Sequence, residues 1–296
     1  MSTHGNHHFV PVFLLKQWRA GKDNKLTVFK RLPDGSLHHD LLGPKSVAHE
    51  RHLYSTSRSS GLPDVSIEKK FLAKLVDDPA GKVHQQMLQR GLQSLSGEQR
   101  KVWAIFLLAS LFRLPALVDS FRAMGRRELL EQFKSMASIS GNTGADEVFQ
   151  QPKYKDLLDD HGMRTFMNAI TSIKHIEWIC NASWSIREMP ASVGTALIGD
   201  LPVGLFGELM ENNFGIIAPI SPRHYFICTS SEKYHLAFAM KHNQRELLKS
   251  TNKWLVLHAM DYVYATDRAH EPLIKKHLGS ARRIHEEREA NAVRAS

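Results

Sequence analysis

Two adjacent histidines near the start of the chain, His7 and His8, are the first residues whose type could carry acid–base chemistry. A histidine titrates near neutral pH, so its ring can exchange a proton with a substrate or bind a metal ion. Neighbours in an extended segment point to opposite faces, so we expect at most one of the two to face a site. The alternative is a structural histidine that hydrogen-bonds the backbone near Pro11.

Asp200 and Arg113 are the charged candidates farther along the chain. Asp200 stands in a Gly-Asp-Leu-Pro segment, where a carboxylate suits catalysis or metal binding, although Asx turns before proline are common. Arg113 follows an apolar helical run, in which an unpaired guanidinium would be costly. The sequence predicts that Arg113 either bridges to Asp200 or Glu68 or clamps a phosphate group.

Evidence for a metal site is loose. His49 and His52 stand three residues apart without a cysteine or a third evident ligand. The sequence has no Gly-rich phosphate loop, no Gly-x-Ser-x-Gly elbow and no His-Glu-x-x-His motif. The cofactor is therefore unknown, and a divalent metal ion is compatible with the candidate residues.

The net charge of +9 points to an anionic partner or to a merely solvated basic surface. The excess is concentrated near the start of the chain, where six cations oppose only Asp23: Lys16, Arg19, Lys22, Lys25, Lys30 and Arg31. We take Lys16 and Arg19 as candidates for substrate binding. Nucleic acid or another polyanion is the partner that this charge favours.

Composition predicts a folded protein of the cytoplasm. The 296 residues are 42% hydrophobic and 23% charged. The longest apolar run, 102–112, is too short for a membrane span, and from the opening residues we expect no secretory signal. Two cysteines, Cys180 and Cys228, suit a reducing compartment. We expect no membrane partner, and the sequence does not indicate the oligomeric state.

Periodicity and turn signals predict an α+β fold with a helical core packed against antiparallel strands. Residues 1–54 read as strands with a hairpin, and 65–172 as mainly helical, with a capping box at Ser96 and Gln99. The 176–229 region reads as a second β portion, with strands at 176–186, 195–198, 214–218 and 224–229. Helices return over 232–290. We expect residues 1–296 to form one integrated domain.

Several short motifs occur in an order that resembles the bacterial domain-of-unknown-function family 4238 over almost the whole chain. The opening run His-His-Phe-Val-Pro-Val-Phe-Leu-Leu is similar to the start of the family, as are five later places: His52 to Tyr54, the Glu68 helix, Arg113 to Pro115, Asp200 to Pro202, and Pro219 to Pro222. Asn252 with Tyr262 to Ala265 resembles the closing helix. Ser110 and Gly199 depart from the pattern, which often has Gln and Ser there.

The resemblance implies no activity, so function must be argued from the residues. It adds Asn252 as a substrate-binding candidate and places motifs around residues 8, 113, 200 and 252, which we expect to converge. The leading hypothesis is a hydrolase of a phosphate-containing polyanion, such as a nuclease. His8, or its neighbour His7, would be the acid or base, Asp200 would orient it or hold a metal ion, and Arg113 would stabilise phosphoryl charge. The alternative is a non-catalytic nucleic-acid-binding or regulatory module.

Overall fold

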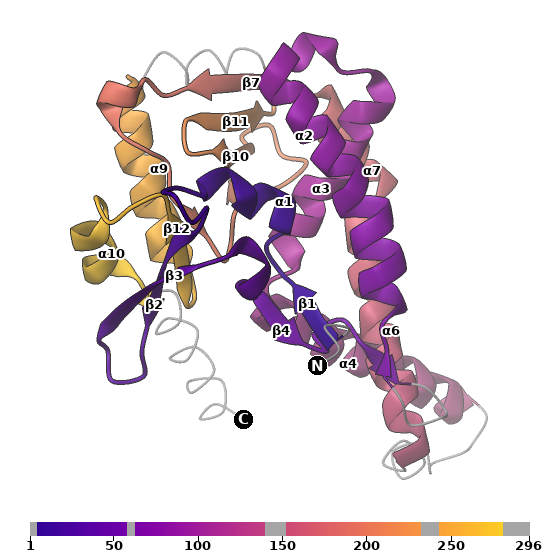
Figure 1. Ribbon diagram of the computed structural model, residues 1–296. Coiled ribbons are helices and arrows are strands. Elements are labelled where there is room, and N and C mark those ends of the chain that lie inside the picture. The colour runs from indigo at the N-terminus through magenta and orange to yellow at the C-terminus, as the bar shows by residue number, and fades with distance from the viewer. Residues whose placement is uncertain (1–4, 58–62, 140–151, 232–242, 281–296) are drawn as a thin grey trace.

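The computed structural model describes residues 5–57, 63–139, 152–231 and 243–280. Two four-stranded antiparallel sheets lie beside a group of helices, so the predicted α+β class is confirmed (Figure 1). Helices α2 (Asp78–Arg90), α3 (Gly97–Phe112), α6 (Pro152–Ile170) and α7 (Ile173–Asn181) lie on one side of the sheets, and α9 (Gln244–His258) lies on the other.

One sheet joins the start of the chain to its end. Its strand order is β3-β2-β12-β8, built from Leu37–Leu42, Leu26–Arg31, Tyr262–Ala265 and Ile198–Gly199. The predicted hairpin is β2 and β3. The expectation of a helix through Tyr262–Ala265 was wrong, because the alternating Tyr-Val-Tyr-Ala run pairs with β2 on one side and β8 on the other.

The second sheet comes wholly from the predicted β portion. Its order is β7-β11-β10-β9, from Ser183–Glu188, His224–Thr229, Gly215–Ser221 and Gly204–Phe206. The strand expected over 176–186 was partly wrong, since α7 extends to Asn181. Ile176 and Ile179, three residues apart, form the buried face of that helix.

The helical region begins with a π-helix, η4 (Ile67–Asp77), which continues directly into α2. Its Ser66 does not cap it through the side chain. The capping box of α3 is present, with Ser96 and Gln99 bonding each other's backbone. Pro115 begins the next helix, α4 (Pro115–Ile139), and the loop expected over 138–152 lies mostly outside the described residues.

Short elements complete the fold. They are the strands β1 (Asn6–His8), β4 (His49–Arg51), β5 (Thr56–Ser57) and β6 (Pro63–Asp64), the helices α1 (Val12–Leu15) and α10 (Glu271–His277), and the 3-10 helices η2 (Lys16–Trp18), η3 (Pro44–Ser46), η5 (Leu92–Ser94) and η6 (Ala191–Val193). Strand β1 pairs with β4, opposing His7 to Glu50 and His8 to His49.

The largest hydrophobic cluster draws residues from Phe9 to Tyr264. A single domain over 1–296 stays a prediction. No helix of the described residues is by itself long and apolar enough to cross a membrane; α3 and α4 pass only as a pair, with an 86° bend between them. A cytoplasmic location also stays a prediction.

Candidate functional site

His7 and His8 face opposite sides of β1, as the sequence predicted. His7 is 1% exposed, and its ring stacks on Tyr54 with centroids 5.7 Å apart. The backbone N–H of Tyr54 donates to His7 Nδ1 at 3.0 Å, so the neutral ring carries its proton on Nε2. Burial, aided by repulsion from His52 and His8, lowers the pKa of His7 to about 4. His7 is therefore neutral at physiological pH.

Because Nδ1 accepts a hydrogen bond, His7 has no free lone pair for a substrate proton or a metal ion. Its Nε2 is buried and has no hydrogen-bond partner within the described part of the chain. A neutral imidazole in this state can only donate a hydrogen bond. The expected role of His7 as a general base is thus not favoured by this geometry.

Glu68, on η4, lies beside this histidine pair. The backbone N–H of His8 contributes a hydrogen bond to the Glu68 carboxylate, and Oε2 is buried without a partner among the described residues. Burial, with repulsion from Asp77, raises the pKa of Glu68 to about 7, against the attraction of Arg113. Glu68 can therefore exchange a proton near neutral pH. The sequence analysis predicted this property for His8 or His7.

Arg113 is completely buried at the C-terminal end of α3. Its guanidinium bonds both oxygens of Asp77, at 3.0 and 3.2 Å, and its Nε donates to the Ala109 carbonyl. The predicted bridge to Asp200 or Glu68 was wrong, although Glu68 is close enough to influence the Arg113 pKa. Its backbone carbonyl accepts from the Tyr54 hydroxyl at 2.9 Å. A guanidinium paired in this way secures the fold and is not free to clamp a phosphate.

Asp200 lies in a different network, after β8. Its carboxylate accepts hydrogen bonds from the backbone N–H groups of Met260, Asp261 and Tyr262, at 2.7–3.0 Å. Burial raises the pKa of Asp200 to about 6, although these three donors oppose the shift. The carboxylate holds the backbone that leads into β12. These bonds reach 60 to 62 positions along the chain, so they differ from the predicted Asx turn, in which the side chain bonds its own backbone two residues on.

Asn252, on α9, has a comparable anchoring role. Its Oδ1 accepts from the Leu197 backbone at 2.9 Å and from the Tyr225 hydroxyl at 3.1 Å, and its Nδ2 donates to the Thr195 carbonyl. The side chain is 1% exposed. With its bonds directed to the protein, Asn252 is not available as a substrate contact.

Three of the predicted residues lie at or near the surface. His8 is partly exposed, with Nε2 3.3 Å from the Lys45 carbonyl, and burial lowers its pKa. Lys16 and Arg19 are exposed, and Arg19 Nε donates to the Lys16 carbonyl. These two residues keep the accessibility that substrate binding requires.

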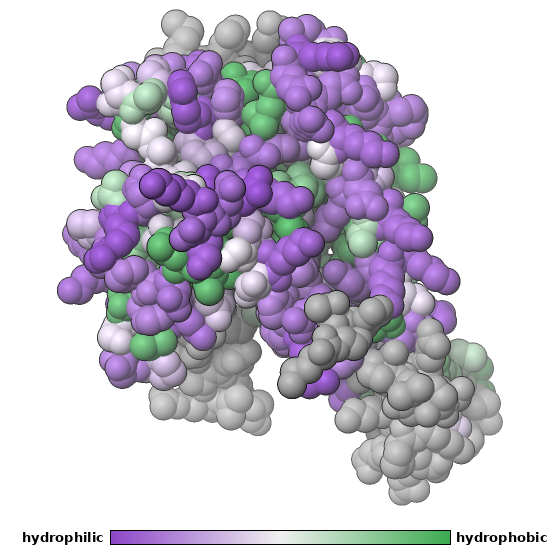
Figure 2. Space-filling view, viewed as in Figure 1, coloured by the Kyte–Doolittle hydropathy of each residue, from purple (hydrophilic) through white to green (hydrophobic). Residues whose placement is uncertain are grey.

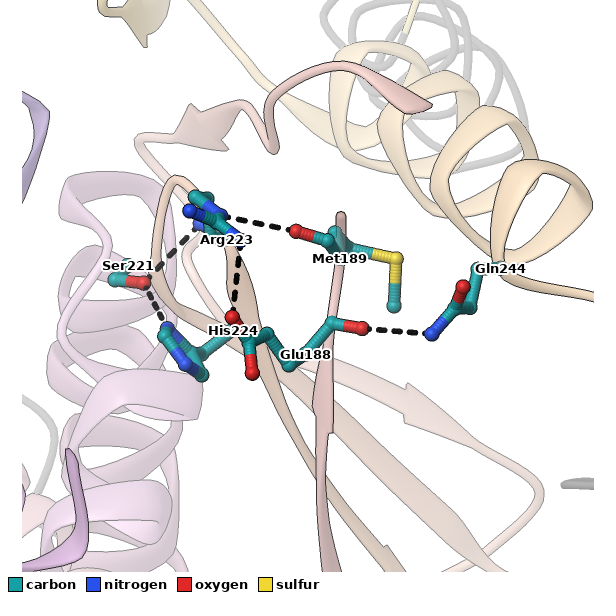
Figure 3. Close-up of polar contacts among 6 residues, drawn as sticks. All are labelled: Glu188, Met189, Ser221, Arg223, His224 and Gln244. Carbon is teal, nitrogen blue, oxygen red and sulfur yellow. Dashed lines mark hydrogen bonds and ion pairs between the residues drawn. The ribbon is translucent and has the colours of Figure 1, made fainter. Parts of the chain in front are cut away.

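A serine–histidine pair occurs at the turn between β10 and β11 (Figure 3). Ser221 Oγ lies 2.8 Å from His224 Nδ1 and also accepts the backbone N–H of Arg223. Arg223 in turn pairs with Glu188 and donates to the Met189 carbonyl. The pair could activate a nucleophile in principle. Since the buried Ser221 hydroxyl is bonded on both sides, we assign it to locking the turn.

The described contacts do not join the motifs around residues 8, 113, 200 and 252 in one site: those around 8 and 113 meet at Glu68, whereas Asp200 and Asn252 bond other segments. No hydrogen bond or ion pair between described residues joins His8, Arg113, Asp200 or Asn252 to one another. Instead, Glu68 and Arg113 lie with the His7–Tyr54 pair, while Asp200 and Asn252 secure separate segments. Among the described residues, no group of three or more His, Cys, Asp or Glu side chains is arranged to hold a metal ion.

Sequence reasoning missed Asp77, because an aspartate at a helix junction resembles an ordinary surface residue. Tyr54 was indicated only by the resemblance, and Glu68 only by the resemblance and as a possible partner of Arg113. The family model for DUF4238, described as a protein of unknown function, matches residues 6–269 of this chain. The chain belongs to the DUF4238 family. No curated protein and no solved structure matches the chain.

The residues that carry the DUF4238 resemblance form two buried polar networks. The first holds β1, η4 and the end of α3 together through His7, Tyr54, Glu68 and Arg113. The second consists of contacts at the 195–200 segment: Asp200 bonds the backbone that leads into β12, and Asn252 joins α9 to residues 195 and 197. In this DUF4238 chain the motifs therefore support the fold directly, and surfaces outside them are open to ligands.

Proposed function

We propose that this chain binds a phosphate-containing polyanion such as nucleic acid and acts as a binding or regulatory module. The contact surface is a basic turn, defined as Lys16, Arg19, Lys22 and Lys25. All four side chains are exposed, and none forms an ion pair with a described acidic residue. This concentration of unpaired cations is the observation that supports the proposal. Phosphate chains release counterions when such cations bind.

Hydrogen bonds to the rest of the protein and within the turn hold the backbone of the basic turn in place. Trp18, fully buried, donates from Nε1 to the Ala196 carbonyl at 2.7 Å, and Ala20 bridges to Lys25. Gly21 and Asn24 reverse the chain with φ of 69° and 51°. Figure 2 shows a strongly hydrophilic band over α1 and the segment that leads to β2. A fixed backbone reduces the entropy lost when the cations engage a ligand.

The hydrolase hypothesis has weaker support. Its expected acid, orienting carboxylate and phosphate clamp lie in separate contacts, and two of them, Asp200 and Arg113, are buried and paired. We therefore favour the module that does not cleave its ligand.

The test measures binding of labelled RNA, single-stranded DNA and duplex DNA at several salt concentrations. We expect Lys22→Gln with Lys25→Gln to weaken binding and to reduce the salt slope for duplex DNA by about 2. A matched control, Lys74→Gln with Lys82→Gln, removes the same charge from exposed positions on η4 and α2.

Equal losses in the two double variants would mean that net charge alone is responsible, and would contradict the basic turn. Incubating the same labelled polymers with Mg²⁺, Mn²⁺ or EDTA distinguishes the hypotheses further. Cleavage by the wild type that is lost in His8→Ala would favour the hydrolase.

A further inference from the structure

A cavity of about 680 Å³ lies between the end of β2, the start of β12 and the end of α10. Its lining includes Lys30, Met260, Tyr262, Lys276 and Leu278. The volume falls within the range of roughly 300–1,000 Å³ that small-molecule sites occupy. It is separate from the first polar network, because neither His7 nor Glu68 is among its described lining residues, and it borders the Asp200 contacts of the second.

Two charged residues hold the walls of this cavity in place. Asp200 holds one wall through the backbone N–H groups of residues 260–262. Arg31 holds the other: its guanidinium donates to the carbonyls of Gly35, Lys275 and Leu278, which joins the β2–β3 turn to the end of α10. Such bonds preorganise the cavity before a ligand arrives.

The cavity carries an excess of positive charge. Lys30, Arg31 and Lys276 oppose Asp261, the one acidic residue among the described lining. Among the described residues, the hydrogen bonds of the Arg31 guanidinium go to carbonyls, two of which lie at the C-terminal end of α10, where the helix dipole is negative. Lys30 Nζ also lies 5.2 Å from the centre of the Tyr262 ring. This field favours an anion.

Apart from Gly35 and Gly279, the uncharged residues of the described lining are apolar or aromatic: Leu32, Pro33, Met260, Tyr262 and Leu278. A bare inorganic ion would leave this surface without a partner. A ligand with an anionic group and an organic body would satisfy both parts of the lining.

We propose that this cavity binds a small phosphorylated organic molecule of about nucleotide size. Lys30 and Lys276 contact the phosphate, and the apolar wall receives the organic body. The site lies at the far end of β2 from the basic turn, roughly 20 Å away for a six-residue strand. The matched family region ends at residue 269, before α10, so the proposal concerns this chain and not its family.

The test is calorimetric titration of the full chain with three probes: adenosine monophosphate, adenosine and inorganic phosphate. We expect adenosine monophosphate to bind most tightly. Lys30→Gln and Lys276→Gln should each weaken its binding about tenfold, the effect of losing one charged contact. The control is Lys275→Gln, an exposed neighbour whose side chain does not line the cavity.

The basic-turn variant Lys22→Gln with Lys25→Gln should leave this binding unchanged, which separates failure of this site from failure of the proposed polyanion surface. Glucose 6-phosphate tests whether the organic body matters. The proposal is overturned if neither phosphorylated molecule binds at millimolar concentration, or if Lys275→Gln weakens binding as much as the two lining variants.

Discussion

At the residue scale, burial converts acidic side chains of this protein into groups that titrate near neutral pH. Glu68 is the clearest case, since its pKa rises from 4.5 to about 7. The folded state then holds more protons than the unfolded state between these values. Stability from this group is therefore lost as pH rises from about 4.5 to about 7, with a slope of at most about 1.4 kcal/mol per pH unit.

We expect Glu68→Gln to remove this part of the pH dependence. The free energy of unfolding of the wild type, relative to the variant, should fall between pH 5 and 7, as measured by urea denaturation. His7 affects the pH dependence in the opposite direction, since its lowered pKa makes stability rise from about pH 4 to 6.5. Because His7 is present in both proteins, its effect cancels in the difference between them. A wild-type-to-variant difference that is flat with pH would contradict the shift; Glu211→Gln, an exposed substitution, is the control.

Asp200 contributes to stability in a different way, because its carboxylate accepts hydrogen bonds from three backbone N–H groups. In Asp200→Asn one of the two acceptor oxygens becomes an NH2 group, which cannot accept a hydrogen bond, so at least one of the three backbone N–H groups loses its acceptor. We expect a loss of about 2–4 kcal/mol in unfolding free energy. Thermal or urea denaturation measures it, against Asp119→Asn on the exposed face of α4. A near-wild-type Asp200→Asn would show that the anchor is dispensable.

At the element scale, α4 and α6 approach so closely that only glycine fits between them. A Cβ added to Gly125 would lie 2.4 Å from the Cα of Gly162, and one added to Gly162 would lie 2.6 Å from the Cα of Arg122. These contacts are with backbone, which cannot yield without separating the helices. The pair therefore sets the distance between α4 and α6.

We expect Gly125→Ala to destabilise the protein by about 1–3 kcal/mol, even though alanine is the better helix former by about 1 kcal/mol. The control is Gly97→Ala at the start of α3, where an added Cβ meets nothing within 4 Å. That variant should be neutral or slightly stabilising. Equal stability of the two variants in thermal denaturation would show that the helices can separate at little cost.

At the scale of the whole molecule, the two surfaces for which we propose ligands lie at opposite ends of β2. The basic turn precedes the strand, and the cavity with Lys30 and Lys276 follows it. Exposed charges are screened over about 8 Å at physiological salt, less than the length of the strand. Polymer binding and small-molecule binding can therefore be tested separately in one protein.

The sequence by itself determined the local features: the β2–β3 hairpin, the capping box of α3, the opposite faces of His7 and His8, and the concentration of cations between Lys16 and Lys25. Each depends on neighbours a few residues apart, and periodicity or spacing records such neighbours directly. The motif order also indicated the family, which requires no contact to be known.

Only the tertiary structure decided which charged groups meet. Arg113 pairs with Asp77, 36 positions earlier, and Asp200 bonds backbone groups 60 positions later. Tyr262–Ala265 became a strand because β2 and β8 present edges on both sides of it. A buried charge takes whichever partner folding brings within reach, and the residue types along the chain do not record that distance.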